Sequence, residues 1–191
     1  MAMRRIGLIV CILAFATMTA GAQTSPSSIV LSDLNKSPAF LRLNGNEEYL
    51  VVVFLSPECP LCQNYTSVLE KLAGSYRGKI ALYGIIPGKS YSVAAVKKFR
   101  SDYHVTFDLL FDRHFQLCRL LKATTTPQVF LISRKNKVLY SGLIDNWAAS
   151  PGVQRTIVTK HYLIDAIDAS LQHLPVNPPT TKPVGCLINT Y

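Results

Sequence analysis

A chain of 191 residues with a formal net charge of +9 is long enough for one domain with its own hydrophobic core. Its lysines and arginines are spread along the chain without interleaved aromatic residues, which favours a solvated basic surface over a nucleic-acid site. We therefore expect no nucleic-acid partner.

The first 22 residues have the pattern of a secretory signal peptide. Two arginines precede an apolar run over residues 6–16, and Ala20-Gly21-Ala22 is a small-residue cleavage pattern. The alternatives are an uncleaved membrane anchor and a lipoprotein modified at Cys11. Cleavage after Ala22 would remove two positive charges, and no later apolar segment is long enough to span a membrane. We expect a periplasmic or secreted protein.

The chain after the cleavage site is expected to have three parts. An N-terminal extension covers residues 23–46, with a disordered start over 23–28, a short strand near 29–31 and an irregular stretch over 37–46. The main domain covers residues 47–174. A tail over residues 175–191, rich in proline and threonine at first, is expected to run extended over the surface.

The main domain alternates strands with helices. A continuous apolar run over residues 49–55 predicts a strand buried on both faces of a sheet. A helix with apolar residues at helical spacing follows it as far as Tyr76. The later elements expected are strand 80–86, helix 92–103, strand 107–111, helix 113–121, a hairpin of 129–132 with 138–141, and helix 159–173. This order predicts an α/β fold with a central mixed sheet and helices on both faces.

The chemistry-bearing motif is Cys59-Pro60-Leu61-Cys62, at the point where the first strand gives way to a helix. Pro60 suits the first helical position, so unpaired backbone N–H groups and the positive end of the helix dipole would surround the Cys59 sulfur. Both favour the thiolate and lower the cysteine pKa below its free value of about 8.5. Cys62 lies one turn further on, and we expect it to be the more shielded sulfur. The motif predicts Cys59 as nucleophile and Cys62 as resolving thiol.

The cysteine pair has three other interpretations. A zinc half-site needs two more ligands at suitable spacing, and the sequence has no second close pair of Cys or His. A c-type haem site needs His directly after the second cysteine, where Gln63 stands. A purely structural disulfide stays open, although a strand-to-helix junction suits reactivity better than stapling. We expect neither a metal nor an organic cofactor.

The second signal is Thr126-Pro127, directly before the strand predicted over 129–132. Proline cannot donate to a central ladder, and a cis Thr126–Pro127 bond at a tight turn would explain its place there. A trans turn is the ordinary alternative.

Four further residues are weaker candidates. Cys118 lies among apolar residues of a predicted helix and is expected to be an inert buried thiol. Cys186 is expected near the surface, where it could pair with Cys118, act as an extra resolving thiol or dock passively. Glu58 is expected to be an exposed turn residue, and Trp147 to shape the chain after the hairpin or to face a substrate.

The sequence resembles the thioredoxin superfamily, and within it the exported bacterial redoxins of the peroxiredoxin-like and TlpA-like kind. The resemblance runs from about residue 49 to the C-terminus, and its motifs lie at residues 51–60, 126–131, 140–146 and 185–188. It implies a thioredoxin-like fold, a cis-Pro127 loop that touches Cys59, and electron exchange between a dithiol and a disulfide. Thr126 and Pro127 would align the incoming sulfur.

The sequence departs from two patterns of that superfamily. Peroxiredoxins carry Pro-x-x-x-Thr-x-x-Cys, and here Ser56 stands for the threonine but Val52 stands in the proline's place. Thioredoxin carries a buried aspartate on the preceding strand, where this chain has Val53. No base that would assist Cys62 is identified from the sequence.

These observations favour an extracytoplasmic thiol-disulfide oxidoreductase. Its partners would be protein thiols or disulfides and an upstream redox protein. A thiol peroxidase is the alternative enzyme, with Cys59 attacking peroxide and Cys62 or Cys186 resolving. A non-catalytic thioredoxin-like binding domain is the second alternative.

Overall fold

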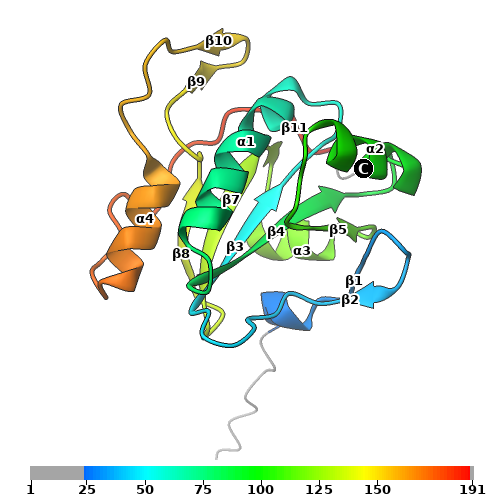
Figure 1. Cartoon of the computed structure of the whole chain (residues 1–191), viewed down its shortest axis with the longest axis horizontal. Coiled ribbons are helices and arrows are strands. Elements are labelled where there is room, and N and C mark those ends of the chain that lie inside the picture. Colours follow the sequence, from blue (N-terminus) through cyan, green and yellow to red (C-terminus); the bar gives the residue numbers. More distant parts are fainter. Residues whose placement is uncertain (1–23, 190–191) are drawn as a thin grey trace, which may run out of the picture.

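A computed structural model describes residues 24–189 of the chain as a central sheet with helices packed around it (Figure 1). The helices are the 3-10 helix η1 (Pro26–Ser28), α1 (Pro60–Ser75), α2 (Val93–Asp102), α3 (Gln116–Leu121) and α4 (Tyr162–Leu171). The strands are β1 (Leu31–Ser32), β2 (Pro38–Ala39), β3 (Tyr49–Phe54), β4 (Ile80–Pro87), β5 (Asp108–Asp112), β6 (Thr125–Thr126), β7 (Gln128–Ser133), β8 (Val138–Gly142), β9 (Ala148–Ser150), β10 (Val153–Gln154) and β11 (Cys186–Leu187).

Seven strands form the main sheet, in the order β2-β1-β5-β4-β3-β7-β8. The three central strands β5, β4 and β3 run parallel, whereas β7 runs antiparallel to β3 and β8 antiparallel to β7. The predicted mixed sheet and its terminal hairpin are confirmed. The expected strands and helices of the main domain lie within a few residues of their predicted bounds.

Strand β3 lies in the centre of the sheet and is buried on both faces, which explains its continuous apolar sequence. Val51 and Val53 belong to the core that packs under α1, α2 and α4. Val52 and Phe54, which point to the other face, belong to a second core with α3 and the N-terminal residues Ile29, Leu31 and Leu41. The helices therefore lie on both faces, as predicted.

The N-terminal segment takes a larger part in the sheet than expected. Strand β1 pairs with β5 at the sheet edge, and β2 pairs with β1. Pro26 is buried within η1, so the expected disordered start is wrong from this residue onward. Burial of apolar side chains against the second core orders this segment. The predicted signal peptide, residues 1–22, lies outside the described residues.

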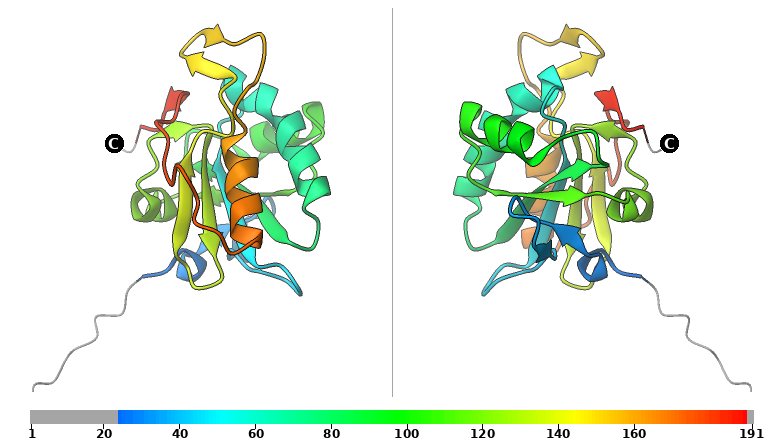
Figure 2. Two further views of the ribbon diagram at one scale, coloured as in Figure 1. Left: turned by 90° about the vertical axis from the view of Figure 1, so that its left-hand side faces the viewer. Right: turned by 90° about the vertical axis from the view of Figure 1, so that its right-hand side faces the viewer.

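Two features after the hairpin were not predicted, namely a second small hairpin and the strand pairing of the extended tail. Strands β9 and β10 form a small separate hairpin between β8 and α4. The C-terminal segment then passes along the outer edge of β8, where Thr180 bridges to Ser141, and ends as β11 beside β6 (Figure 2). Within residues 24–189, no helix is long and apolar enough to cross a membrane.

Candidate active site

The cysteine pair lies at the N-terminus of α1, directly after the central strand. Cys59 is the N-cap residue of this helix and Pro60 fills its first position, as predicted. Proline costs nothing there because the first helical N–H groups have no partner within the helix. The Cys59 sulfur therefore lies at the positive end of the helix dipole.

The Cys59 thiol is strongly acidic. Its pKa is lowered to about 5, above all by a hydrogen bond from the Cys62 thiol and further by one from Cys186, and these outweigh the opposing effect of burial. Backbone N–H groups of the same two residues also favour the charged form. At neutral pH, Cys59 is a thiolate.

The Cys62 thiol has the opposite character. It is fully buried, and its pKa is raised well above the ordinary value by that burial and by the neighbouring Cys59. The Ser56 backbone N–H donates to its sulfur at 3.4 Å. One sulfur of the pair is therefore ready to attack, while the other holds its proton.

The loop before β7 meets the first sulfur. The Thr126–Pro127 bond is cis, as predicted, and the Cys59 thiol donates to the Thr126 carbonyl oxygen at 3.2 Å. That bond exists only while Cys59 is protonated; as a thiolate, Cys59 accepts from Cys62 and Cys186 instead. The side-chain oxygen of Gln128 accepts from the Thr124 N–H at 2.9 Å and steadies the loop.

Cys186 is the third sulfur of the site. Its Sγ lies 2.8 Å from Cys59 Sγ, to which it donates a hydrogen bond. Although the residue as a whole is exposed, its sulfur is partly covered, and its pKa is raised to about 11, first by that partial burial and then by the adjacent Cys59. Of the three roles left open for this residue, pairing with Cys118 does not occur, because Cys118 is buried elsewhere and its thiol donates to the Ala123 carbonyl. All four described cysteines are free thiols.

The side-chain contacts of Trp147 and Ser56 were not predicted from the sequence. The Tyr65 hydroxyl, on α1, donates to the buried Asp145 carboxylate at 2.5 Å, and the Trp147 ring packs edge-on against Tyr65. Trp147 thus shapes the chain against the helix that carries the cysteines. Ser56 shares a hydrogen bond with Tyr91 at 2.7 Å, and Glu58 is exposed, as expected.

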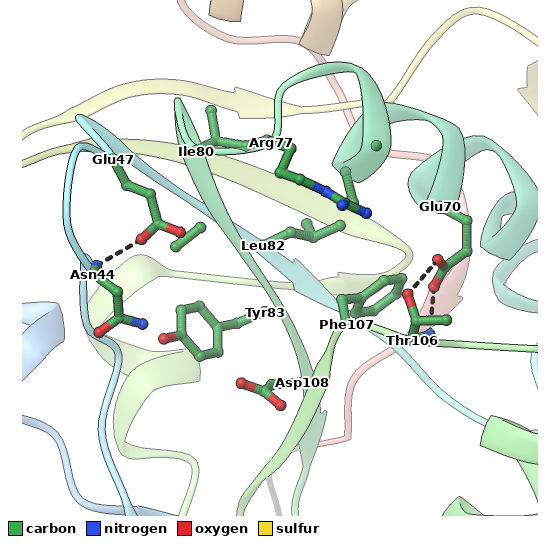
Figure 3. A pocket seen from close by; sticks show the side chains of 13 residues that line it. Asn44, Glu47, Glu70, Arg77, Ile80, Leu82, Tyr83, Thr106, Phe107 and Asp108 are labelled. Atoms are coloured by element: carbon green, nitrogen blue, oxygen red, sulfur yellow. Dashed lines mark hydrogen bonds between the residues drawn. The ribbon is translucent and has the colours of Figure 1, made fainter.

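A separate pocket of about 320 Å³ lies beside the C-terminal half of α1 and the start of β4 (Figure 3). None of the four described cysteines lines it. Its two glutamates are engaged locally: Glu70 accepts from the Thr106 N–H at 2.6 Å, and Glu47 from the Asn44 N–H at 2.6 Å. Among residues 24–189, no group of three or more His, Cys, Asp or Glu side chains is arranged to hold a metal ion.

Comparison with known proteins places most of the chain in a family. The AhpC/TSA family matches residues 26–141. A hypothetical protein of Sinorhizobium meliloti 1021 has 27% identity and a TM-score of 0.75, over 86% of this chain and 92% of that chain. An uncharacterized conserved protein of Geobacillus kaustophilus has 21% identity and a TM-score of 0.74, over 87% and 90%.

The fold is also that of known redox proteins. A secreted disulfide oxidoreductase of Mycobacterium tuberculosis, homologous to E. coli DsbE, has 19% identity and a TM-score of 0.50, over 58% of this chain and 79% of that chain. None of the curated proteins compared with this chain matches it. The predicted thioredoxin-like fold of the redoxin group is confirmed.

Proposed function

The chain belongs to the AhpC/TSA family, and from that premise we propose that it is an extracytoplasmic thiol-disulfide oxidoreductase working through the Cys59–Cys62 couple. One observation carries the proposal. Two thiols one helical turn apart have opposite pKa shifts, with Cys59 at about 5 and Cys62 well above its ordinary value. A thiolate nucleophile beside a protonated resolving thiol is the arrangement that disulfide exchange needs.

The exchange has two steps. The Cys59 thiolate attacks one sulfur of a partner's disulfide, so a mixed disulfide forms and the other partner sulfur leaves as a thiolate. Cys62 then loses its proton and attacks the Cys59 sulfur, which releases the partner's second sulfur. The partner disulfide is reduced to a dithiol, and the Cys59–Cys62 dithiol is oxidised to a disulfide; the reverse direction oxidises a partner.

The first step also prepares the second. While Cys59 is a thiolate, its charge and its hydrogen bond raise the pKa of Cys62. Both contributions disappear once the Cys59 sulfur is neutral in the mixed disulfide, and only burial still opposes ionisation of Cys62. The resolving thiol therefore becomes more acidic when its attack is required.

Two observations support action outside the cytoplasm. The sequence of residues 1–22 has the signal-peptide pattern, and a protein of similar fold is a secreted disulfide oxidoreductase. Disulfides persist in such compartments, so protein thiols and disulfides would be available there as partners, together with an upstream redox protein that resets the couple.

The test compares exchange variants against a protein disulfide substrate. Cys59→Ser is expected to abolish exchange. The double variant Cys62→Ser/Cys186→Ser, which lacks both thiols that contact Cys59, is expected to trap the partner as a mixed disulfide on Cys59, detected by mass spectrometry. Fast single-turnover consumption of peroxide by Cys59, with slow exchange, would replace the proposal with the peroxidase alternative. Absence of both reactions in the wild-type protein would leave only the binding-domain alternative.

A further inference from the structure

The C-terminal strand β11 occupies a sheet edge directly beside the reactive sulfur. It pairs antiparallel with β6, so Cys186 lies opposite Thr126 and Leu187 opposite Thr125. The Ile188 N–H donates to the Thr124 carbonyl at 2.9 Å and extends the ladder. An exposed sheet edge is a general binding place for an extended peptide, and here the chain's own tail fills it.

This tail also closes the site. Cys59 is only 2% exposed, whereas Leu187 on the covering strand is 84% exposed. Strand β11 has only two residues, and both are solvent-exposed. A short ladder with few buried contacts opens at low cost compared with global unfolding. Because Cys186 on this strand contacts the Cys59 sulfur, we expect access of a partner to Cys59 to require release of the strand.

We propose that β11 is a built-in substitute for the substrate: it occupies the binding position of a partner's extended cysteine-bearing segment, and Cys186 exchanges with the Cys59–Cys62 disulfide to give a Cys59–Cys186 disulfide. This inference rests on the proposed function. A partner segment would displace β11, pair with β6 in the same register and present its own cysteine to Cys59.

The internal exchange needs no further oxidant. The Cys186 sulfur, as a thiolate, attacks the Cys59 sulfur; the Cys59–Cys186 bond forms while the Cys59–Cys62 bond breaks. The electron pair passes to the Cys62 sulfur, which takes up one proton for the one that Cys186 has lost. The protein holds one disulfide before and after the step. In the oxidised protein Cys59 carries no charge. The contribution of that charge to the raised pKa of Cys186 is therefore absent.

The residue before the inserted cysteine determines what fits. A Cβ atom on Gly185 would lie 2.2 Å from the Thr126 carbonyl oxygen and 3.1 Å from the Pro127 nitrogen, and both are backbone atoms that cannot rotate away. A segment that binds in this register therefore needs glycine before its cysteine, or must stand further from β6. The substrates best suited to the site are extended segments with a Gly-Cys pair.

The first test traps the internal disulfide. A Cys62→Ser variant is oxidised with oxidised glutathione, acid-quenched, alkylated, digested and analysed by mass spectrometry. The Cys59–Cys186 peptide is expected as the main product, and the matched Cys62→Ser/Cys186→Ser variant is expected to keep glutathione on Cys59. Persistent glutathione on Cys59 with Cys186 free would overturn the inference. Exchange activity of the wild-type protein, measured separately, decides the proposed function independently of this result.

The second test releases the strand without touching a thiol. Gly185→Ala is expected to raise the iodoacetamide reaction rate of reduced Cys59 by about tenfold or more, because the strand can no longer lie against Thr126. Gly74→Ala is the matched control, since a Cβ there meets no atom within 4 Å. Both are compared with wild type at about pH 9, where the Cys59 thiol is largely ionised with or without its Cys186 partner. Equal rates in all three proteins would show that β11 does not cover the sulfur.

Discussion

Cys59 and Cys118 have similar surroundings by the usual measures of accessibility. Their exposed fractions are 2% and 1%, and each thiol donates to a backbone carbonyl oxygen, at 3.2 Å for Cys59 and 3.4 Å for Cys118. Their acidities nevertheless lie far apart. The pKa of Cys59 is lowered to about 5, whereas that of Cys118 is raised to about 11.

The difference in acidity comes from the hydrogen-bond donors and charges near each sulfur. Cys59 caps a helix and accepts hydrogen bonds from two other thiols. Cys118 lies inside the short helix α3, where burial and the charge of Asp112 both oppose ionisation. The Asp112 carboxylate accepts the Cys118 backbone N–H at 2.8 Å. Burial together with a nearby negative charge therefore makes the Cys118 thiol inert, whereas hydrogen-bond donors around the buried Cys59 sulfur outweigh the effect of burial.

The largest expected difference is in catalysis. Cys59→Ser is expected to lower the disulfide-exchange rate by about a thousandfold or more, because the thiolate nucleophile is lost. Cys118→Ala is expected to change this rate by no more than about twofold, since its sulfur takes no part in exchange. Stopped-flow exchange with a protein disulfide measures both. A large loss on Cys118→Ala would contradict the inert role assigned to its thiol.

The second difference is in pH dependence. The alkylation rate of reduced Cys59 is expected to rise as pH increases through about 5 and then to level off, because the thiolate is the reacting form. Cys118 is expected to gain reactivity only towards about pH 11. Peptide-resolved alkylation across pH provides both profiles. A midpoint of Cys59 near the free-cysteine value of about 8.5 would contradict its assigned acidity.

A smaller shift is expected from removing the third sulfur. In Cys186→Ala, Cys59 loses one hydrogen-bond donor but keeps that of Cys62, so its pKa is expected to rise to a value between 5 and the ordinary 9.0. The ultraviolet absorbance of the thiolate, titrated with pH, measures this change. An unchanged midpoint would show that Cys186 contributes nothing to the acidity.

The smallest effect separates stability from acidity within α1. Tyr65→Phe removes the hydrogen bond to the buried Asp145 and is expected to lower the free energy of unfolding by about 1–2 kcal/mol. The Cys59 pKa is expected to stay unchanged, since Tyr65 does not contribute to it. Urea unfolding and thiolate titration of the same variant measure the two quantities. A shifted Cys59 pKa would show that the whole helix sets the acidity.

Local sequence patterns predicted much of the fold and part of the site. Three features determine structure within a few residues: the apolar run of β3, the proline after Cys59 and the Thr-Pro pair before β7. Local sequence was therefore enough to predict them. The contact between Cys186 and Cys59 joins residues 127 positions apart. It depends on the path of the tail along β8 and on a two-residue pairing with β6, which no local periodicity indicates.

The hydrogen bond between Thr181 and Tyr140 limits how far Cys186 can move from the site. The Thr181 side chain shares a hydrogen bond with the Tyr140 hydroxyl at 2.7 Å and accepts the Leu143 N–H at 2.9 Å. A Cβ on Gly142 would lie 2.2 Å from the same threonine oxygen, so glycine permits this close approach.

With Thr181 fixed, a tether of five residues leads to Cys186. Its length lets Cys186 move no more than about 17 Å from Thr181. A tether this short gives the Cys186 thiol an effective concentration in the millimolar range at Cys59. A free peptide at micromolar concentration would rarely displace β11 from its position beside Cys59. Only partners that bring additional contact surface would gain regular access, so the tether acts as a selectivity threshold.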